Sequence, residues 1–91
     1  MTQIARRYLV RGRVQGVGFR HFVGKLANSL GVRGYVRNLD NGSVEVYATG
    51  SAEQLAELEG QLWRGPRSAD VHGVEEEEAA WENYSGFQTR G

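Results

Sequence analysis

The chain has 91 residues, of which 40% are hydrophobic, which is enough for one compact domain with a single core. Its 11 basic residues balance 11 acidic ones, and cysteine is absent. This balance excludes the broad positive field on which nonspecific binding to nucleic acid or membranes depends, and the lack of cysteine excludes disulfides and thiolate metal sites. We therefore expect a single domain, residues 1–91, with one functional site.

The first residues form no apolar run long enough for a signal peptide. No stretch of about 20 apolar residues, the length of a membrane-spanning helix, occurs elsewhere. The absence of cysteine is compatible with a reducing compartment. We therefore expect a soluble, cytoplasmic protein that does not bind membranes.

The first predicted element is a strand over residues 8–14, where side chains alternate between two faces. A short turn follows at residues 15–18 and contains two glycines. Apolar side chains then recur at helical spacing from Phe19 to Leu30, and Gly31 is a suitable residue to end that helix. The sequence therefore begins as strand, glycine turn and amphipathic helix.

The next two strands are predicted at residues 32–39 and 43–49. Between them stands the pair Asn41-Gly42, which is a strong short-range signal for a hairpin turn. These two strands should therefore be antiparallel neighbours in one sheet.

A second helix is predicted to begin at Ser51, which has the spacing of a capping box with Gln54. Three leucines form its apolar stripe, and Gly65-Pro66 ends it. Residues 71–78 indicate a fourth strand that ends in four glutamates, and residues 86–88 indicate a short edge strand. Because strand residues alternate faces, at most two of these glutamates could converge on a cation, so a solvated edge is the simpler interpretation.

The predicted order β-α-β-β-α-β is that of the ferredoxin-like fold. This fold is an α+β sandwich in which two helices cover one face of an antiparallel sheet. The glycine turn then lies between the first strand and the first helix. A turn in that position is where the backbone can bind a ligand.

Residues 15–20 combine features that suit an oxyanion. Gly16 and Gly18 permit unusual backbone angles, so that several N–H groups can converge on one anion at the start of the helix. Arg20 adds a planar, forked cation, and together these groups could hold a doubly charged phosphoryl group. The glycine spacing matches neither the Walker motif nor the dinucleotide motif, so a tight turn without a ligand is the alternative.

Two segments resemble the signature segments of acylphosphatases. The first is Gly12-Arg13-Val14-Gln15-Gly16-Val17-Gly18-Phe19-Arg20, and the second is Gly34-Tyr35-Val36-Arg37-Asn38, followed by Gly42-Ser43-Val44-Glu45-Val46. The similarity continues through Gly65-Pro66 and Phe87, so it covers essentially the whole chain. Two departures are small: Leu39 replaces a residue that is often polar in the animal enzymes, and Tyr35 stands where tryptophan is common.

The resemblance implies a hydrolase that cleaves the carboxyl-phosphate bond of small-molecule acyl phosphates without a cofactor or metal. In that family the phosphate is bound by the backbone amides of one loop, which here are those of Gln15, Gly16, Val17, Gly18 and Phe19. It also implies that Arg20 binds the phosphate oxygens and that Asn38 holds the nucleophilic water. From the residues alone, Asn38 would be an ordinary strand-end residue. A monomer is expected, because such a site lies within one chain.

Two alternatives remain at this point. Tyr35 and Tyr47 could face outward and stack bases, as in RNA-recognition modules with the same order of elements, but the strand at 43–49 lacks their basic and aromatic signature. The chain could also be a regulatory domain that keeps the anion loop without turnover, since similar units are fused within larger maturation proteins. We interpret His21 and His72 as surface side chains rather than catalytic bases.

Overall fold

A computed structural model describes residues 2–91 of the chain. The described part contains two helices and five strands. In chain order these are β1 (Ile4–Arg13), α1 (Phe19–Leu30), β2 (Arg33–Asn38), β3 (Val44–Gly50), α2 (Ala52–Arg64), β4 (Asp70–Glu78) and β5 (Phe87–Thr89). The predicted order of elements is therefore confirmed, and both predicted helices begin and end where the sequence indicates.

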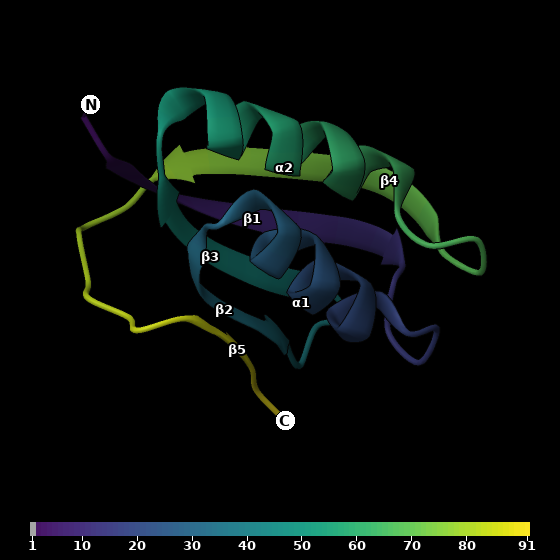
Figure 1. The fold of residues 1–91 in the computed structure, drawn as a ribbon. Coiled ribbons are helices and arrows are strands. Elements are labelled where there is room, and N and C mark those ends of the chain that lie inside the picture. The colour runs from purple at the N-terminus through teal and green to yellow at the C-terminus, as the bar shows by residue number, and fades with distance from the viewer. Residues whose placement is uncertain (1) are drawn as a thin grey trace.

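The five strands form one sheet in the order β4-β1-β3-β2-β5. β1 is antiparallel to β3 and β4, and β2 is antiparallel to β3 across the predicted hairpin. Both helices cover the same face of this sheet (Figure 1). The ferredoxin-like α+β sandwich is confirmed, with one difference: β5 runs parallel to β2, so the sheet is mixed rather than wholly antiparallel.

β1 begins at Ile4, well before the predicted start at Tyr8. The alternation of apolar residues is hidden there because Arg6 and Arg7 are adjacent. In the sheet, Arg7 Nε lies 3.0 Å from a carboxylate oxygen of the buried Glu45 on β3. Cross-strand pairing therefore supports a strand whose own sequence pattern is weak.

The four glutamates at residues 75–78 are exposed on β4, which is an edge strand. The prediction of a solvated edge is confirmed. Three of them also form ion pairs with arginines of β1: Arg11–Glu75 at 3.0 Å, Arg7–Glu77 at 3.4 Å and Arg6–Glu76 at 3.5 Å. No group of three or more His, Cys, Asp or Glu residues within 2–91 is arranged to hold a metal ion.

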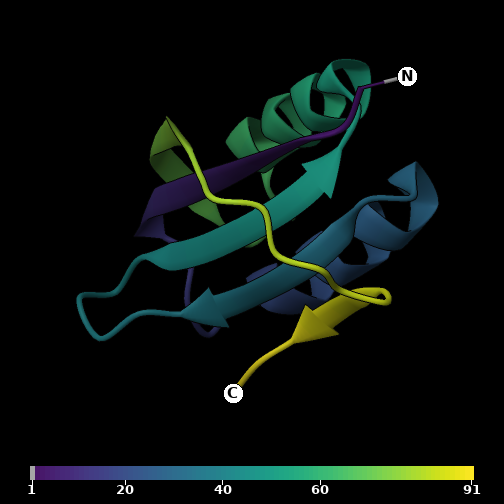
Figure 2. The ribbon, with the colours of Figure 1, turned by 90° about the vertical axis from the view of Figure 1, so that its left-hand side faces the viewer.

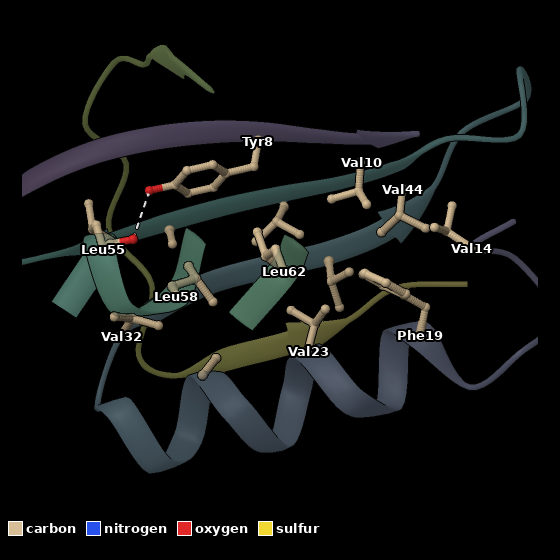
Figure 3. Packing of buried hydrophobic residues seen from close by; sticks show 14 residues of the cluster. Tyr8, Val10, Val14, Phe19, Val23, Val32, Val44, Leu55, Leu58 and Leu62 are labelled. Atoms are coloured by element: carbon tan, nitrogen blue, oxygen red, sulfur yellow. Dashed lines mark hydrogen bonds between the residues drawn. The ribbon is translucent and has the colours of Figure 1, made fainter. Parts of the chain in front are cut away.

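The core lies between the helices and the sheet (Figure 3). β1 contributes Tyr8 and Val10, and the Tyr8 hydroxyl donates a hydrogen bond to the Leu55 carbonyl oxygen at 3.3 Å. The predicted leucine stripe of α2 is buried here and consists of Leu55, Leu58 and Leu62. The capping box of α2 is also confirmed, because Ser51 and Gln54 exchange hydrogen bonds of 3.1 and 2.7 Å.

The opposite face of the sheet is crossed by residues 79–86, which join β4 to β5 and which we call the C-terminal crossover (Figure 2). Tyr35 and Tyr47 stack beneath it with ring centroids 5.6 Å apart, and Tyr84 packs on both rings. The Tyr47 hydroxyl donates to the Ala80 carbonyl oxygen at 2.7 Å. Tyr47 is fully buried and Tyr35 nearly so. These tyrosines therefore do not form the open stacking surface that an RNA-recognition module requires.

Candidate active site

The turn between β1 and α1 is anchored at its start by Val14, which is buried in the core. Gly16 and Gly18 have φ angles of 73° and 79°, in the left-handed region that side chains other than glycine rarely adopt. A β-carbon at either position would meet no atom within 4 Å. The two glycines are therefore required by the backbone conformation and not by crowding.

The N-terminus of α1 is open. Gly18 occupies the N-cap position without a side-chain hydrogen bond, and the first turn contains no acidic residue. By contrast, α2 begins with a capping box and has Glu53 in its first turn. The first N–H groups of a helix have no intrahelical acceptor and carry partial positive charge, so the start of α1 is suited to an anion.

A pocket of about 510 Å³ opens at this helix terminus. Its lining includes five of the seven residues expected from the sequence, namely Gly16, Gly18, Phe19, Arg20 and Asn38. Val14, His21, Thr89 and Gly91 complete the lining. Of the other two expected residues, Val17 packs against the core. The fold therefore brings together Arg20 and Asn38, which lie on different elements.

The side chain of Gln15 has a structural role that the sequence did not reveal. Its side-chain Nε2 donates hydrogen bonds to the carbonyl oxygens of Leu39 at 2.8 Å and Ser43 at 2.9 Å. Both acceptors belong to the hairpin between β2 and β3, directly after Asn38. Gln15 thus fixes the glycine turn against the hairpin that carries Asn38.

Asn38 is the last residue of β2, and its side-chain oxygen Oδ1 is buried. Within the described residues this oxygen accepts no hydrogen bond. A buried acceptor without a donor costs about 1–3 kcal/mol. The cost is offset when a donor such as water occupies the pocket beside it.

Arg20 is half-buried in the first turn of α1. Its Nη1 donates a hydrogen bond to the main-chain carbonyl oxygen of Arg90, just after β5. Arg90 is itself held in place, because its N–H donates to the Val36 carbonyl oxygen at 2.9 Å and its guanidinium carbon lies 4.0 Å from the centroid of the Tyr35 ring. The end of the chain therefore restrains the guanidinium of Arg20.

His21, Thr89 and Gly91 also line the pocket, and none of the three was expected there from the sequence. His21 is exposed, as predicted, but it also lines the pocket. Thr89 reaches the site because β5 pairs with β2, where Val36 is its partner in the register. A pairing between segments some fifty residues apart leaves no local pattern, so no sequence signal could have found it.

Comparison with known proteins shows to which family the chain belongs. The profile of the acylphosphatase family matches residues 6–89. An acylphosphatase of Solibacter usitatus (strain Ellin6076) is 58% identical over 86 residues, which cover 94% of this chain and 90% of the relative.

Solved structures agree with this match. An acylphosphatase from Coxiella burnetii superposes with a TM-score of 0.93 at 41% identity, covering 97% of this chain and 93% of that one. An acylphosphatase from Bacillus subtilis also gives a TM-score of 0.93 at 32% identity, covering 99% and 100% of the two chains.

The sandwich and its open helix terminus define a small α+β domain with a pocket suited to anions. The chain belongs to the acylphosphatase family and is an enzyme that hydrolyses acyl phosphates. The family resemblance of the two signature segments is therefore confirmed. No helix within residues 2–91 is long and apolar enough to cross a membrane.

Proposed function

We propose that the enzyme binds the phosphoryl group of its substrate with the backbone amides of residues 15–19 and with Arg20, while Asn38 positions the attacking water. The observation that carries this proposal is the single pocket that Gly16, Gly18, Arg20 and Asn38 line together. The uncapped start of α1 and the guanidinium of Arg20 supply positive charge, and the unpaired Oδ1 of Asn38 supplies an acceptor for water.

In the proposed reaction the water oxygen attacks phosphorus and forms a new P–O bond. The bond between phosphorus and the carboxyl oxygen breaks, and the acyl part leaves as a carboxylate. A proton of the water passes to a phosphate oxygen, so that the products are a carboxylate and dihydrogen phosphate. Because the leaving group is already a good one, orientation and charge stabilisation are the main contributions required of the protein.

An uncharged amide suits the position of Asn38. Its Oδ1 accepts a hydrogen bond from the water without placing a negative charge beside the incoming phosphate, whereas aspartate at the same position would repel it. The restraint of the hairpin by Gln15 supports this part of the proposal, since a water must be held within a fraction of an ångström of its line of attack.

We further propose that the enzyme is a single-domain monomer in the cytoplasm that acts on small molecules and not on nucleic acid. The residues assigned to phosphate and to water lie around one pocket in a single copy of the chain, so the proposed site needs no residue from a second copy. The formal net charge is zero, and the tyrosines that could have stacked bases lie beneath the C-terminal crossover.

The test is release of phosphate from benzoyl phosphate by the wild-type chain and by Asn38→Ala. We expect turnover by the wild type and a fall in kcat of about 100-fold in the variant with a smaller change in KM, because positioning is lost while phosphate binding remains. Asn28→Ala, at an exposed position of α1, is the matched control. A wild-type chain that binds phosphate but releases none from benzoyl phosphate would instead be a regulatory domain, and full activity in Asn38→Ala would remove Asn38 from the mechanism.

A further inference from the structure

The side chain of Gln15 contacts the hairpin and does not line the pocket. Its Nε2 donates hydrogen bonds to the carbonyl oxygens of Leu39 at 2.8 Å and Ser43 at 2.9 Å. A glutamine amide has two N–H groups, so these two carbonyls engage both of them. The side chain therefore has no donor left for a phosphate, and the main-chain N–H of Gln15 is the group that remains available for one.

The two carbonyl oxygens belong to the neck of the hairpin that follows Asn38. The Leu39 N–H donates to the Ser43 carbonyl oxygen at 2.8 Å, and the Gly42 N–H donates to the Leu39 carbonyl oxygen at 3.2 Å. Asn38 itself is paired with β3 in the sheet. The hairpin therefore closes on itself without Gln15, and what the glutamine adds is a fixed position of the closed hairpin relative to the glycine turn.

The hydrogen bonds of Gln15 join the two parts of the proposed site. The main chain of residues 15–19 binds the phosphoryl group on one side, and Asn38 holds the water on the other. Within residues 2–91, no other side-chain hydrogen bond joins residues 14–18 to residues 38–43. Because the rate of attack depends steeply on the distance and angle between water and phosphorus, the spacing of these two parts matters for catalysis.

The length and the two donors of glutamine suit this position. Asparagine is shorter by one methylene, so its amide could not reach both carbonyls from the same backbone position. Ionised glutamate has the right length but accepts hydrogen bonds, and it would repel both the carbonyl oxygens and the incoming phosphate. Methionine has nearly the same length and cannot donate. Gln15→Met therefore removes the two hydrogen bonds and changes little else.

We propose that Gln15 is a positioning residue for the hydrolysis, whose two hydrogen bonds set the distance between the phosphate-binding main chain and Asn38. This inference rests on the proposed function of the same pocket. The side chain of Gln15 touches neither the phosphate nor the water. Its effect therefore appears in the rate of the chemical step and not in the binding of phosphate.

The test is the steady-state kinetics of Gln15→Met with benzoyl phosphate, together with inhibition by inorganic phosphate. The main-chain N–H of residue 15 is retained, so we expect KM and the inhibition constant of phosphate to stay within about twofold of the wild type. We expect kcat to fall by about tenfold, because Asn38 is no longer held at a fixed distance from the phosphorus. Gln61→Met is the matched control, since the Gln61 amide bonds Glu57 of its own helix, and it should leave kcat unchanged.

A second control separates positioning from a general loss of stability. Gln15→Met should lower Tm by a few degrees, because two hydrogen bonds are lost. Ser51→Ala removes the capping box of α2 at the end of β3 remote from Asn38, and it should lower Tm comparably without lowering kcat. A fall in kcat of the same size in Ser51→Ala would show that lost stability is the cause, and it would overturn the positioning role.

Gln15→Met combined with Asn38→Ala shows whether Gln15 acts through Asn38. If it does, the double variant has about the kcat of Asn38→Ala alone, because no water-holding amide is left to position. Losses that multiply, an unchanged kcat in Gln15→Met or a raised inhibition constant of phosphate would each overturn the positioning role, and hydrolysis by the wild type would still support the proposed function. A wild-type chain that releases no phosphate would contradict the proposed function and the positioning role together.

Discussion

Arg20 occupies a position that would be unfavourable without a ligand. It lies in the first turn of α1, where the helix dipole favours negative side chains. One of its nitrogens is already engaged by the Arg90 carbonyl oxygen, which leaves the rest of the planar fork free to meet phosphate oxygens. The guanidinium of Arg20 is therefore held in one orientation, and its positive charge lies where an anion would be favoured.

Arg20→Lys tests whether the fork, and not only the charge, is required. Lysine keeps one positive charge but cannot donate to Arg90 and to a phosphate in the same fixed geometry. We expect KM to rise and kcat to fall, with kcat/KM lower by about 30-fold, which corresponds to about 2 kcal/mol. Steady-state kinetics with benzoyl phosphate measure this, and Arg67→Lys, at an exposed position after α2, is the control. Wild-type kinetics in Arg20→Lys would contradict the assignment.

Arg20 and Asn38 determine the expected pH dependence of the reaction. Neither a guanidinium nor an amide titrates near neutral pH. With benzoyl phosphate, whose acyl part is uncharged, we therefore expect kcat to be nearly flat across neutral pH. A steep change near pH 6.5, where histidines ordinarily titrate, would implicate His21 or His72 in the reaction and contradict the mechanism.

Among the elements, those with local signals were predicted well from the sequence. The glycine at position 31, the capping box at Ser51 and the Asn41-Gly42 hairpin each act within a few residues, so the pattern is visible in the sequence itself. The start of β1 and the parallel pairing of β5 were not predicted, because both depend on partners distant in the chain.

The residues of the candidate site, too, could be predicted from the sequence only where their signal is local. The glycine turn and Arg20 follow from local chemistry, whereas the role expected of Asn38 came from the family resemblance alone. Its position at a strand end carries no chemical signal of its own. The walls contributed by His21 and Thr89 could not be predicted, since they depend on β5 lying beside α1.

The contact between α2 and β4 contains a carboxylate in an unfavourable position. Burial raises the pKa of Glu59 above its ordinary value of 4.5, and the charge of Glu76 on β4 raises this pKa further. A raised pKa means that the folded state holds the proton more tightly than the unfolded chain. Stability is therefore lost as the pH rises from below 4.5 through the raised value, and the loss persists at neutral pH.

Glu59→Gln should remove that cost. We expect a higher Tm than the wild type at pH 7 and no gain at a pH well below 4.5, where Glu59 is protonated in both states. Thermal unfolding at the two pH values measures the difference. Glu57→Gln, on the exposed side of the same helix, serves as the control. An equal gain for Glu59→Gln at both pH values would show that charge is not the cause.

At the scale of the whole molecule, side chains pack in clusters on both faces of the sheet. One face packs against the helices and forms the main core, and the other carries the cluster of Tyr35, Tyr47 and Tyr84 beneath the C-terminal crossover. Arg90 joins this second cluster to the pocket: its side chain lies over Tyr35, and its N–H donates to Val36. Its carbonyl oxygen accepts from Arg20, so packing on the far face of the sheet helps to orient a side chain in the pocket.

Arg90→Ala tests this connection because it removes the stacked guanidinium and keeps the main-chain carbonyl. Loss of the cation–π contacts should lower the free energy of unfolding by about 1 kcal/mol, and looser restraint of Arg20 should lower kcat/KM by about tenfold. Thermal unfolding and steady-state kinetics measure the two effects, with Arg33→Ala, exposed on β2, as the control.

The double variant Arg20→Lys with Arg90→Ala separates a connected pair from two independent losses. If Arg90 acts through Arg20, the double variant loses little more kcat/KM than Arg20→Lys alone, because the restraint has no fork left to orient. Full additivity of the two losses, or normal kcat/KM in a destabilised Arg90→Ala, would mean that the tyrosine cluster stabilises the fold without orienting Arg20.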